Sequence, residues 1–207
     1  CFVVVKDGAV VYEYYSSDDY RSSVHNYWSM TKTLGALIVG WAVTHRNLDI
    51  DKDIEKTYGV SSPRSYPVTM RQIMSQALDG EDGPGEAWKY DVKGDHWVDV
   101  MTEVIPVSTG LNASQIWREE FQTPLGLSKE FAWTHVDTHW ETGALGTCRD
   151  LARVMQLILN KGRWKGLEKP VISADFVNQM VTPQTKFAPF TNYSNPCYGL
   201  LTWLYTD

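Results

Sequence analysis

Ser29 and Lys32 are the residues best suited to chemistry, and they head a long apolar stretch of the sequence. Residues three apart share one face of a helix, so the serine hydroxyl and the lysine ammonium can come within hydrogen-bonding distance. Serine is a weak nucleophile until a base removes its proton, and burial of a lysine favours the neutral form that can act as this base. The spacing therefore fits a nucleophile with its base. A polar first turn that merely caps a core helix is the alternative, since about one Ser-x-x-Lys match is expected in roughly 200 residues.

Histidines and cysteines give weaker signals. His135 and His139 are four residues apart, but no Glu or third His stands at the spacing used by zinc enzymes. We therefore expect surface histidines, and neither a metal nor another cofactor. Cys1, Cys148 and Cys197 lack the close spacing of structural zinc sites and leave room for one disulfide and one free thiol.

Composition limits the class of protein. The 207 residues carry a formal net charge of −6, with acidic and basic residues interspersed. The sequence therefore lacks the basic patch that nucleic-acid binding requires, and we expect no nucleic-acid partner. The longest apolar stretch, Leu34–Val43, is roughly half of the ~20 residues that a membrane-spanning helix needs, and we expect no membrane span or targeting segment. Asn-x-Ser sequons at Asn112 and Asn192 slightly favour an extracytoplasmic or secreted protein, although about one match is expected by chance.

The elements that must position Ser29 and Lys32 begin with a hairpin. Residues Cys1–Tyr15 place two β-rich runs around Lys-Asp-Gly, the composition of a tight turn. Tyr27–Arg46 then predicts a long helix whose middle is apolar on nearly every face. We expect this helix in the centre of the molecule.

Shorter helices are predicted further along, at Val68–Ala77, Trp97–Thr109, Ser114–Phe121, Arg149–Lys161 and Ser173–Val181. The last segment, Tyr198–Tyr205, has the composition of one strand. With only two earlier strands, the sheet would have about three strands, too few to cover the helices. Leu200 and Leu201 would then face solvent on an open edge. We therefore expect a chain truncated at its C-terminus.

Several runs of sequence, in order along the chain, resemble the penicillin-recognising serine hydrolases, the family of class C β-lactamases, DD-peptidases and related esterases. They are His25–Leu34, Ala42–Ile54, Val68–Gln76, Pro84–Tyr90, Pro124–Leu127 and Thr142–Arg153. The resemblance covers essentially the whole chain and implies an α/β (α+β) fold, in which an antiparallel sheet flanked by helices carries an inserted all-helical lobe. We expect a single domain, with the sheet lobe at 1–46 and 134–207 and the helical lobe at 47–133.

The resemblance also suggests roles for individual residues. Ser29 matches the acylated nucleophile, Lys32 the partner that activates it, and Tyr90 the tyrosine that passes a proton to the leaving group. A phenolic oxygen near a lysine ammonium is biased toward phenolate and can act as a general base. A tyrosine that only packs helices is the alternative at Tyr90. We assign contact with the substrate to Trp28, Gln76 and Val92.

Two departures from the family pattern bear on substrate and rate. β-Lactamases and DD-peptidases usually have an asparagine two positions after the tyrosine, where this chain has Val92, so we favour an ester or amide over a lactam. The third motif of the family, Lys-Thr-Gly or His-x-Gly, would lie downstream of Asp207. Its strand supplies one N–H of the oxyanion hole, and loss of such a donor costs on the order of 10²–10³ in rate. We expect residues 1–207 alone to be weakly active or inactive.

The sequence therefore predicts a serine hydrolase that forms an acyl-enzyme on a small ester or amide. The alternative is a non-catalytic binding or assembly protein of the same fold, favoured by the missing third motif and by the short segment between Gln76 and Pro84. As partners we expect a small-molecule ester, amide or lactam substrate. We also expect a missing C-terminal segment, or another chain, to complete the sheet.

Overall fold

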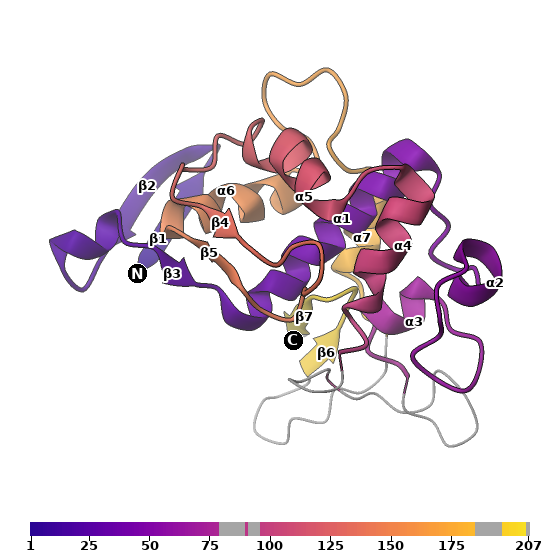
Figure 1. Ribbon diagram of the computed structural model, residues 1–207. Coiled ribbons are helices and arrows are strands. Elements are labelled where there is room, and N and C mark those ends of the chain that lie inside the picture. The colour runs from indigo at the N-terminus through magenta and orange to yellow at the C-terminus, as the bar shows by residue number, and fades with distance from the viewer. Residues whose placement is uncertain (79–89, 91–95, 185–195, 206–207) are drawn as a thin grey trace.

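The computed structural model describes residues 1–78, 90, 96–184 and 196–205 (Figure 1). In chain order its elements are β1 (Phe2–Lys6), β2 (Ala9–Tyr14), η1 (Asp18–Arg21), β3 (His25–Asn26), η2 (Trp28–Met30), α1 (Thr31–Arg46), α2 (Ile54–Tyr58), α3 (Met70–Met74), α4 (Val100–Thr109), α5 (Ala113–Ile116), η3 (Trp117–Gln122), β4 (Ala132–Trp133), β5 (Ala144–Gly146), α6 (Cys148–Leu159), α7 (Ala174–Met180), β6 (Pro196–Tyr198) and β7 (Trp203–Tyr205). Here η1 and η2 are 3-10 turns and η3 is a π-helical segment. Within the described ranges, no helix combines the length and apolarity needed to cross a bilayer.

Helix α1 runs through the middle of the molecule, between the small strands on one side and α4 on the other (Figure 1). Every residue from Leu34 to Ala42 is buried. Full burial of a leucine or isoleucine side chain is worth about 1.5–3 kcal/mol, so this stretch is a major source of stability. The predicted central helix is confirmed. It begins at Thr31 instead of Tyr27, because Trp28–Met30 wind as the 3-10 turn η2.

Two glycines let other elements approach α1 closely. A Cβ at Gly35 would lie 2.5 Å from the ring of Trp140, and a Cβ at Gly40 would lie 2.6 Å from the ring of Phe176. Phe176 belongs to α7, whereas Trp140 precedes β5. The missing side chains therefore let α7 and the segment before β5 pack directly against the backbone of α1.

Among the described residues the strands form three separate antiparallel sheets, β1-β2, β3-β5-β4 and β6-β7, so the expectation of one sheet of about three strands is wrong. The first sheet is the predicted hairpin, with Lys6 paired to Ala9 across a two-residue turn. Both turn residues, Asp7 (φ 52°) and Gly8 (φ 77°), have the positive φ that such tight turns require. Small antiparallel sheets among helices nevertheless confirm the predicted fold class.

The C-terminal segment is two strands, not one. Gly199 N donates to Thr202 O at 2.9 Å and closes a turn between β6 and β7. Inside this turn Leu200 and Leu201 are buried, and Leu201 N donates to Met74 O at 2.8 Å. The turn thus folds these two leucines back against α3, so they give no argument for an exposed apolar edge.

The hairpin is fastened to the beginning of α6. A disulfide joins Cys1 to Cys148, and Cys197 is a buried free thiol. Arg149 makes two charge-assisted hydrogen bonds to the carboxylate of Glu13, from Nε at 2.6 Å and from Nη2 at 2.5 Å. The guanidinium of Arg149 lowers the pKa of Glu13 to about 2. These two bonds hold β1-β2 beside α6.

Helix α6 itself begins at a buried carboxylate. Burial alone would raise the pKa of Asp150, but hydrogen bonds from Ser128 and Thr147 outweigh it and lower this pKa. Thr147 and Asp150 also form the capping box that starts the helix. Helix α7 is capped by Ser173, whose Oγ accepts from Phe176 N at 3.2 Å.

The other predicted helices are present and mostly shorter, whereas the one predicted at 114–121 is the longer run of α5 and η3. The described part of 47–133 holds α2, α3, α4, α5 and η3, and its last residues form β4. Because β4 pairs with β5, this region is joined to the strands that follow it. The division into a sheet lobe and an inserted helical lobe stays a prediction.

Candidate active site

Ser29 lies in η2, the turn that leads from β3 directly into α1. Trp28, just before it, has a φ of 48°, and its N–H donates to Asn26 Oδ1 at 2.8 Å. Positive φ at a bulky residue is a strained conformation, and such strain clusters at functional sites. The turn leaves Ser29 exposed at the amino end of α1. Trp28, the residue before it, is 69% exposed.

Distant segments hold this turn in place. Tyr27 N donates to Ala144 O at 2.9 Å, and Ala144 N donates to Thr31 Oγ1 at 3.2 Å, so β5 brackets the turn from both ends. Thr33 Oγ1 donates to Leu201 O at 2.8 Å and ties α1 to the turn between β6 and β7. The position of the nucleophile candidate is therefore fixed by segments more than 100 residues away.

Lys32 points from the first turn of α1 into the interior, where it is 2% exposed. Its Nζ donates to the backbone oxygen of Glu141 at 3.3 Å and lies 4.8 Å from the centroid of the Tyr90 ring. A buried ammonium needs partners of this kind, a hydrogen-bond acceptor and the negative face of an aromatic ring. The Tyr90 ring in turn contacts Tyr198 and Trp203, with centroids 6.1 and 5.3 Å away. Residues from four distant parts of the chain thus meet at Lys32.

The structure brings some of the sequence-predicted site residues together and not others. Lys32 and Tyr90 come together, with Lys32 Nζ 4.8 Å from the ring centroid, and Ser29 lies in the turn three residues before Lys32. Gln76 is fully buried after α3, with a φ of 60°, and its Nε2 donates to Ile73 O at 3.3 Å. Val92 lies outside the described residues. The catalytic and substrate-binding roles stay predictions.

A second polar cluster shares Glu141 with the Lys32 contact. His139 Nδ1 lies 2.8 Å and His96 Nδ1 lies 3.3 Å from the same oxygen, Asp99 Oδ2, and His96 Nδ1 is 3.5 Å from Glu141 Oε1. The sequence drew attention to His139, but Asp99 and Glu141 did not stand out. No spacing rule could have found the group, because 40 residues separate Asp99 from His139 and only folding joins them.

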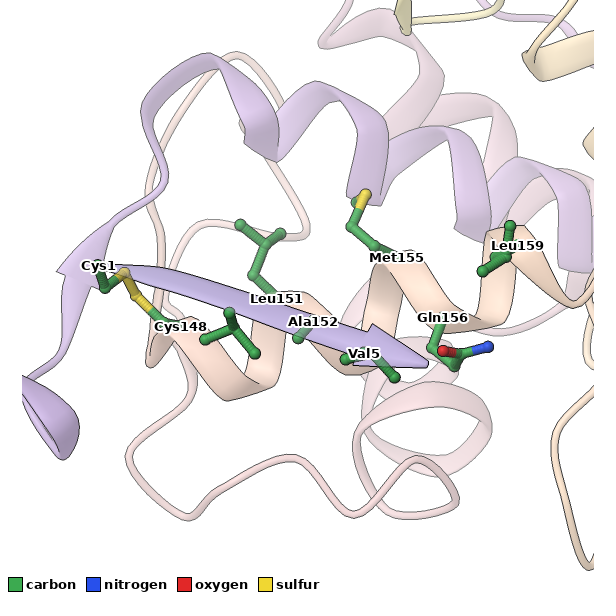
Figure 2. A pocket seen from close by; sticks show the side chains of 9 residues that line it. Cys1, Val5, Cys148, Leu151, Ala152, Met155, Gln156 and Leu159 are labelled. Carbon is green, nitrogen blue, oxygen red and sulfur yellow. A yellow bond between two sulfur atoms is a disulfide. The ribbon is translucent and has the colours of Figure 1, made fainter. Parts of the chain in front are cut away.

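An apolar groove lies elsewhere, between β1 and α6 (Figure 2). It measures about 460 Å³, and Leu151, Met155 and Leu159 of α6 stand along it, with Val5 of β1 nearby. Neither Ser29 nor Lys32 lines it. The groove is therefore separate from the candidate active site.

Comparison with known proteins gives a consistent family. The model of the Beta-lactamase family matches residues 1–205. Among solved structures, the octameric penicillin-binding protein homologue from Pyrococcus abyssi superposes with a TM-score of 0.74 at 17% identity, over 98% of this chain and 60% of its own. A candidate beta-lactamase from Bacteroides dorei gives 0.77 at 19% identity, over 97% of this chain and 72% of its own. A D-stereospecific amidohydrolase from Streptomyces gives 0.64 at 17% identity, over 88% and 71%.

These likenesses concern the fold. No curated protein sequence matches the chain. The chain spans 60% of the Pyrococcus protein, less than two thirds of its length.

Proposed function

The chain belongs to the beta-lactamase family, and we propose that it is a serine hydrolase that acts through an ester on Ser29. The observation that carries the proposal is the environment of Lys32. A lysine amine 2% exposed, near the aromatic ring of Tyr90 and one helical turn from an exposed serine, combines the parts that an activated nucleophile needs. A purely structural lysine gains little from burial, because desolvation of its charge costs stability.

The reaction would run in two steps. Deprotonated Lys32 takes the proton from Ser29 Oγ, and this oxygen then bonds to the carbonyl carbon of the substrate. The tetrahedral intermediate collapses as the bond to the leaving group breaks, and the leaving group takes a proton relayed by Tyr90. Water then attacks the ester on Ser29, which releases the acid and restores the hydroxyl. The backbone N–H of Ser29, at the start of α1, supplies one donor to the developing oxyanion.

The proposed substrate is a small ester or amide. Val92 stands where lactam-processing relatives have an asparagine, and the loss of that amide disfavours a β-lactam. The fold of an amidohydrolase from Streptomyces supports chemistry of this class on such a scaffold.

We also propose that a further polypeptide segment, from the same protein or from another chain, packs on the apolar face of β1-β2 and α6. The groove of Figure 2 and the exposed side chains beside it support this proposal, since exposed apolar patches mark interaction surfaces.

A serine-directed fluorophosphonate tests the proposed nucleophile. Intact-mass spectrometry of the labelled chain should show one adduct, which Ser29→Ala abolishes and Lys32→Met slows. Ser61→Ala, at another exposed serine, is the matched control and should label as the wild type does. Labelling that survives Ser29→Ala would contradict the role of Ser29. A wild-type chain that folds but takes up no label even on prolonged exposure would favour the non-catalytic alternative, since weak activity only slows labelling.

A further inference from the structure

We propose that His96, Asp99, His139 and Glu141 form a binding site for a divalent transition-metal ion, of which Zn²⁺ fits best. The four side chains offer two imidazole nitrogens and two carboxylate oxygens, a donor set that suits Zn²⁺. Ligand atoms of three of them, His96, Asp99 and His139, all lie within 4.8 Å of one another. This proposal goes beyond the hydrolase proposal and does not depend on it.

The distances suit a tetrahedral ion. Atoms bound 2.0–2.1 Å from a tetrahedral Zn²⁺ stand roughly 3.3–3.4 Å apart. His96 Nδ1 lies 3.3 Å from Asp99 Oδ2 and 3.5 Å from Glu141 Oε1, while His139 Nδ1 lies 2.8 Å from the Asp99 oxygen. An ion held by His96, Asp99 and His139 would replace the ring protons in these short contacts, whereas Glu141, which contacts only His96 of the three, would have to move closer to become the fourth ligand.

Charge and burial favour a cation at this place. The side chains of Asp99 and Glu141 are only 11% and 8% exposed, and both carboxylates face His96. Two carboxylates that share a poorly solvated site repel each other unless positive charge lies between them. His96 and His139 are about half exposed, so an ion can enter from solvent between the two rings.

Backbone groups already orient the carboxylates. Trp140 N donates to Asp99 Oδ1 at 2.7 Å, which leaves the other oxygen of Asp99 directed to the histidines. His96 N donates to Glu141 Oε1 at 3.2 Å. Metal ligands in proteins are characteristically held by such outer hydrogen bonds. Trp140 is itself fully buried against Gly35, so this support is rigid.

The site would also be coupled to Lys32. The backbone oxygen of Glu141 accepts a hydrogen bond from Lys32 Nζ. The side chain of Glu141 contacts His96 of the proposed site. An ion that fixes Glu141 would therefore fix an acceptor of the buried lysine. Binding and hydrolysis remain separable, because an ion can bind whether or not Ser29 reacts.

Equilibrium dialysis of the full chain against micromolar Zn²⁺, followed by elemental analysis, tests the site. We expect one Zn²⁺ per chain, and an affinity at least tenfold weaker in the variant His96→Ala/His139→Ala. Non-reducing conditions keep Cys1 and Cys148 in their disulfide, so these cysteines cannot bind Zn²⁺ together with His25, the second group of ligand-type residues within the described ranges. Both replaced rings are half exposed, so the variant should fold, as circular dichroism will show.

His135→Ala is the matched control. Its ring centroid lies 6.0 Å from that of His139, but His135 is not among the clustered ligands. Retention of one Zn²⁺ in this control, together with its loss in the double variant, supports the site. A wild-type chain that takes up no Zn²⁺, a double variant that binds Zn²⁺ as tightly as the wild type, or an equal weakening in the control would each overturn the proposal.

Discussion

Two regions of the molecule, the central helix α1 and the β1-β2 hairpin, are held in place in different ways. Around α1 the chain is stabilised by continuous apolar packing, with every residue from Leu34 to Ala42 buried. The β1-β2 hairpin instead exposes large apolar side chains, including Phe2, Val11 and Tyr14. It is fastened to α6 by one disulfide and by the ion pair of Glu13 with Arg149.

The packing of α1 therefore stabilises the domain as a whole, whereas the disulfide and the ion pair attach the hairpin to it. The candidate active site lies at the amino end of α1, where Lys32 is buried and bonded to groups from distant segments. Loosening the hairpin should therefore leave the surroundings of Lys32 intact, whereas disturbing α1 should unfold the whole domain. Four changes, from the largest expected effect to the smallest, test this contrast.

Removing the disulfide should have the largest effect. Cys1 and Cys148 are 147 residues apart, and a link closing so long a loop is worth about 3–5 kcal/mol in the unfolded-chain entropy model. We expect Cys1→Ser/Cys148→Ser to lower the free energy of unfolding by this amount in urea titrations. Hydrogen exchange should accelerate in β1 and β2 more than in α1. Equal acceleration in both would remove the contrast, and Cys197→Ser, which spares the disulfide, is the control.

Filling the space beside α1 should come next. A Cβ at Gly40 would already lie 2.6 Å from the ring of Phe176 and 2.9 Å from Ile172, so Gly40→Val forces α1 and α7 apart. Overpacking of this kind costs about 3 kcal/mol. Urea unfolding should show one cooperative transition at a lower midpoint, with hydrogen exchange faster throughout. The exposed control Val107→Ala should lower the free energy of unfolding by less than about 0.5 kcal/mol. An equally small loss in Gly40→Val would mean that α1 and α7 can move apart at little cost.

The ion pair of the hairpin predicts a smaller, pH-dependent effect. Arg149 lowers the pKa of Glu13 from 4.5 to about 2, so the native state holds this carboxylate charged in acid where the unfolded state protonates it. The contribution of Glu13 is therefore complete above about pH 4.5 and is lost as the pH falls toward 2. Because Arg149 is partly exposed, we expect Glu13→Gln to cost on the order of 1 kcal/mol at neutral pH.

To check this pH dependence, the free energy of unfolding of Glu13→Gln is compared with that of the wild type from neutral pH down to pH 2. The difference should shrink toward zero as the pH falls. Arg21→Gln, which removes the more exposed partner of Glu13, should have a smaller effect. A difference that stays constant with pH would show that the charge of Glu13 is not what fastens the hairpin.

Local features of the fold were predictable from sequence, because neighbouring residues determine them. Asp7 and Gly8 form the hairpin turn, since the twist of the strands demands positive φ there. Ser173 caps α7 through a side chain three residues from its donor. The uniformly apolar middle of α1 similarly required a central position.

Features that depend on distant segments were not predictable. The split of 198–205 into two strands depends on Leu201 N reaching Met74 O, a contact across more than 100 residues. Three cysteines allow several pairings, and only the fold selects Cys1 with Cys148. In the candidate site, motif order pointed to Lys32, but the carbonyl of Glu141 that holds its amine carries no side-chain signature in the sequence.

The smallest effect is expected at the groove between β1 and α6. Leu159 is 72% exposed and lines that groove, so Leu159→Lys removes no packing within this chain and should change its stability by less than about 0.5 kcal/mol. An exposed apolar face nevertheless favours association, and a charge placed on it opposes association. In sedimentation velocity runs over a range of concentrations, the wild-type chain should therefore self-associate more than Leu159→Lys. A loss of stability above about 1 kcal/mol would show that Leu159 belongs to the core of this chain. Equal sedimentation of the two proteins would show that the groove does not mediate self-association of this chain.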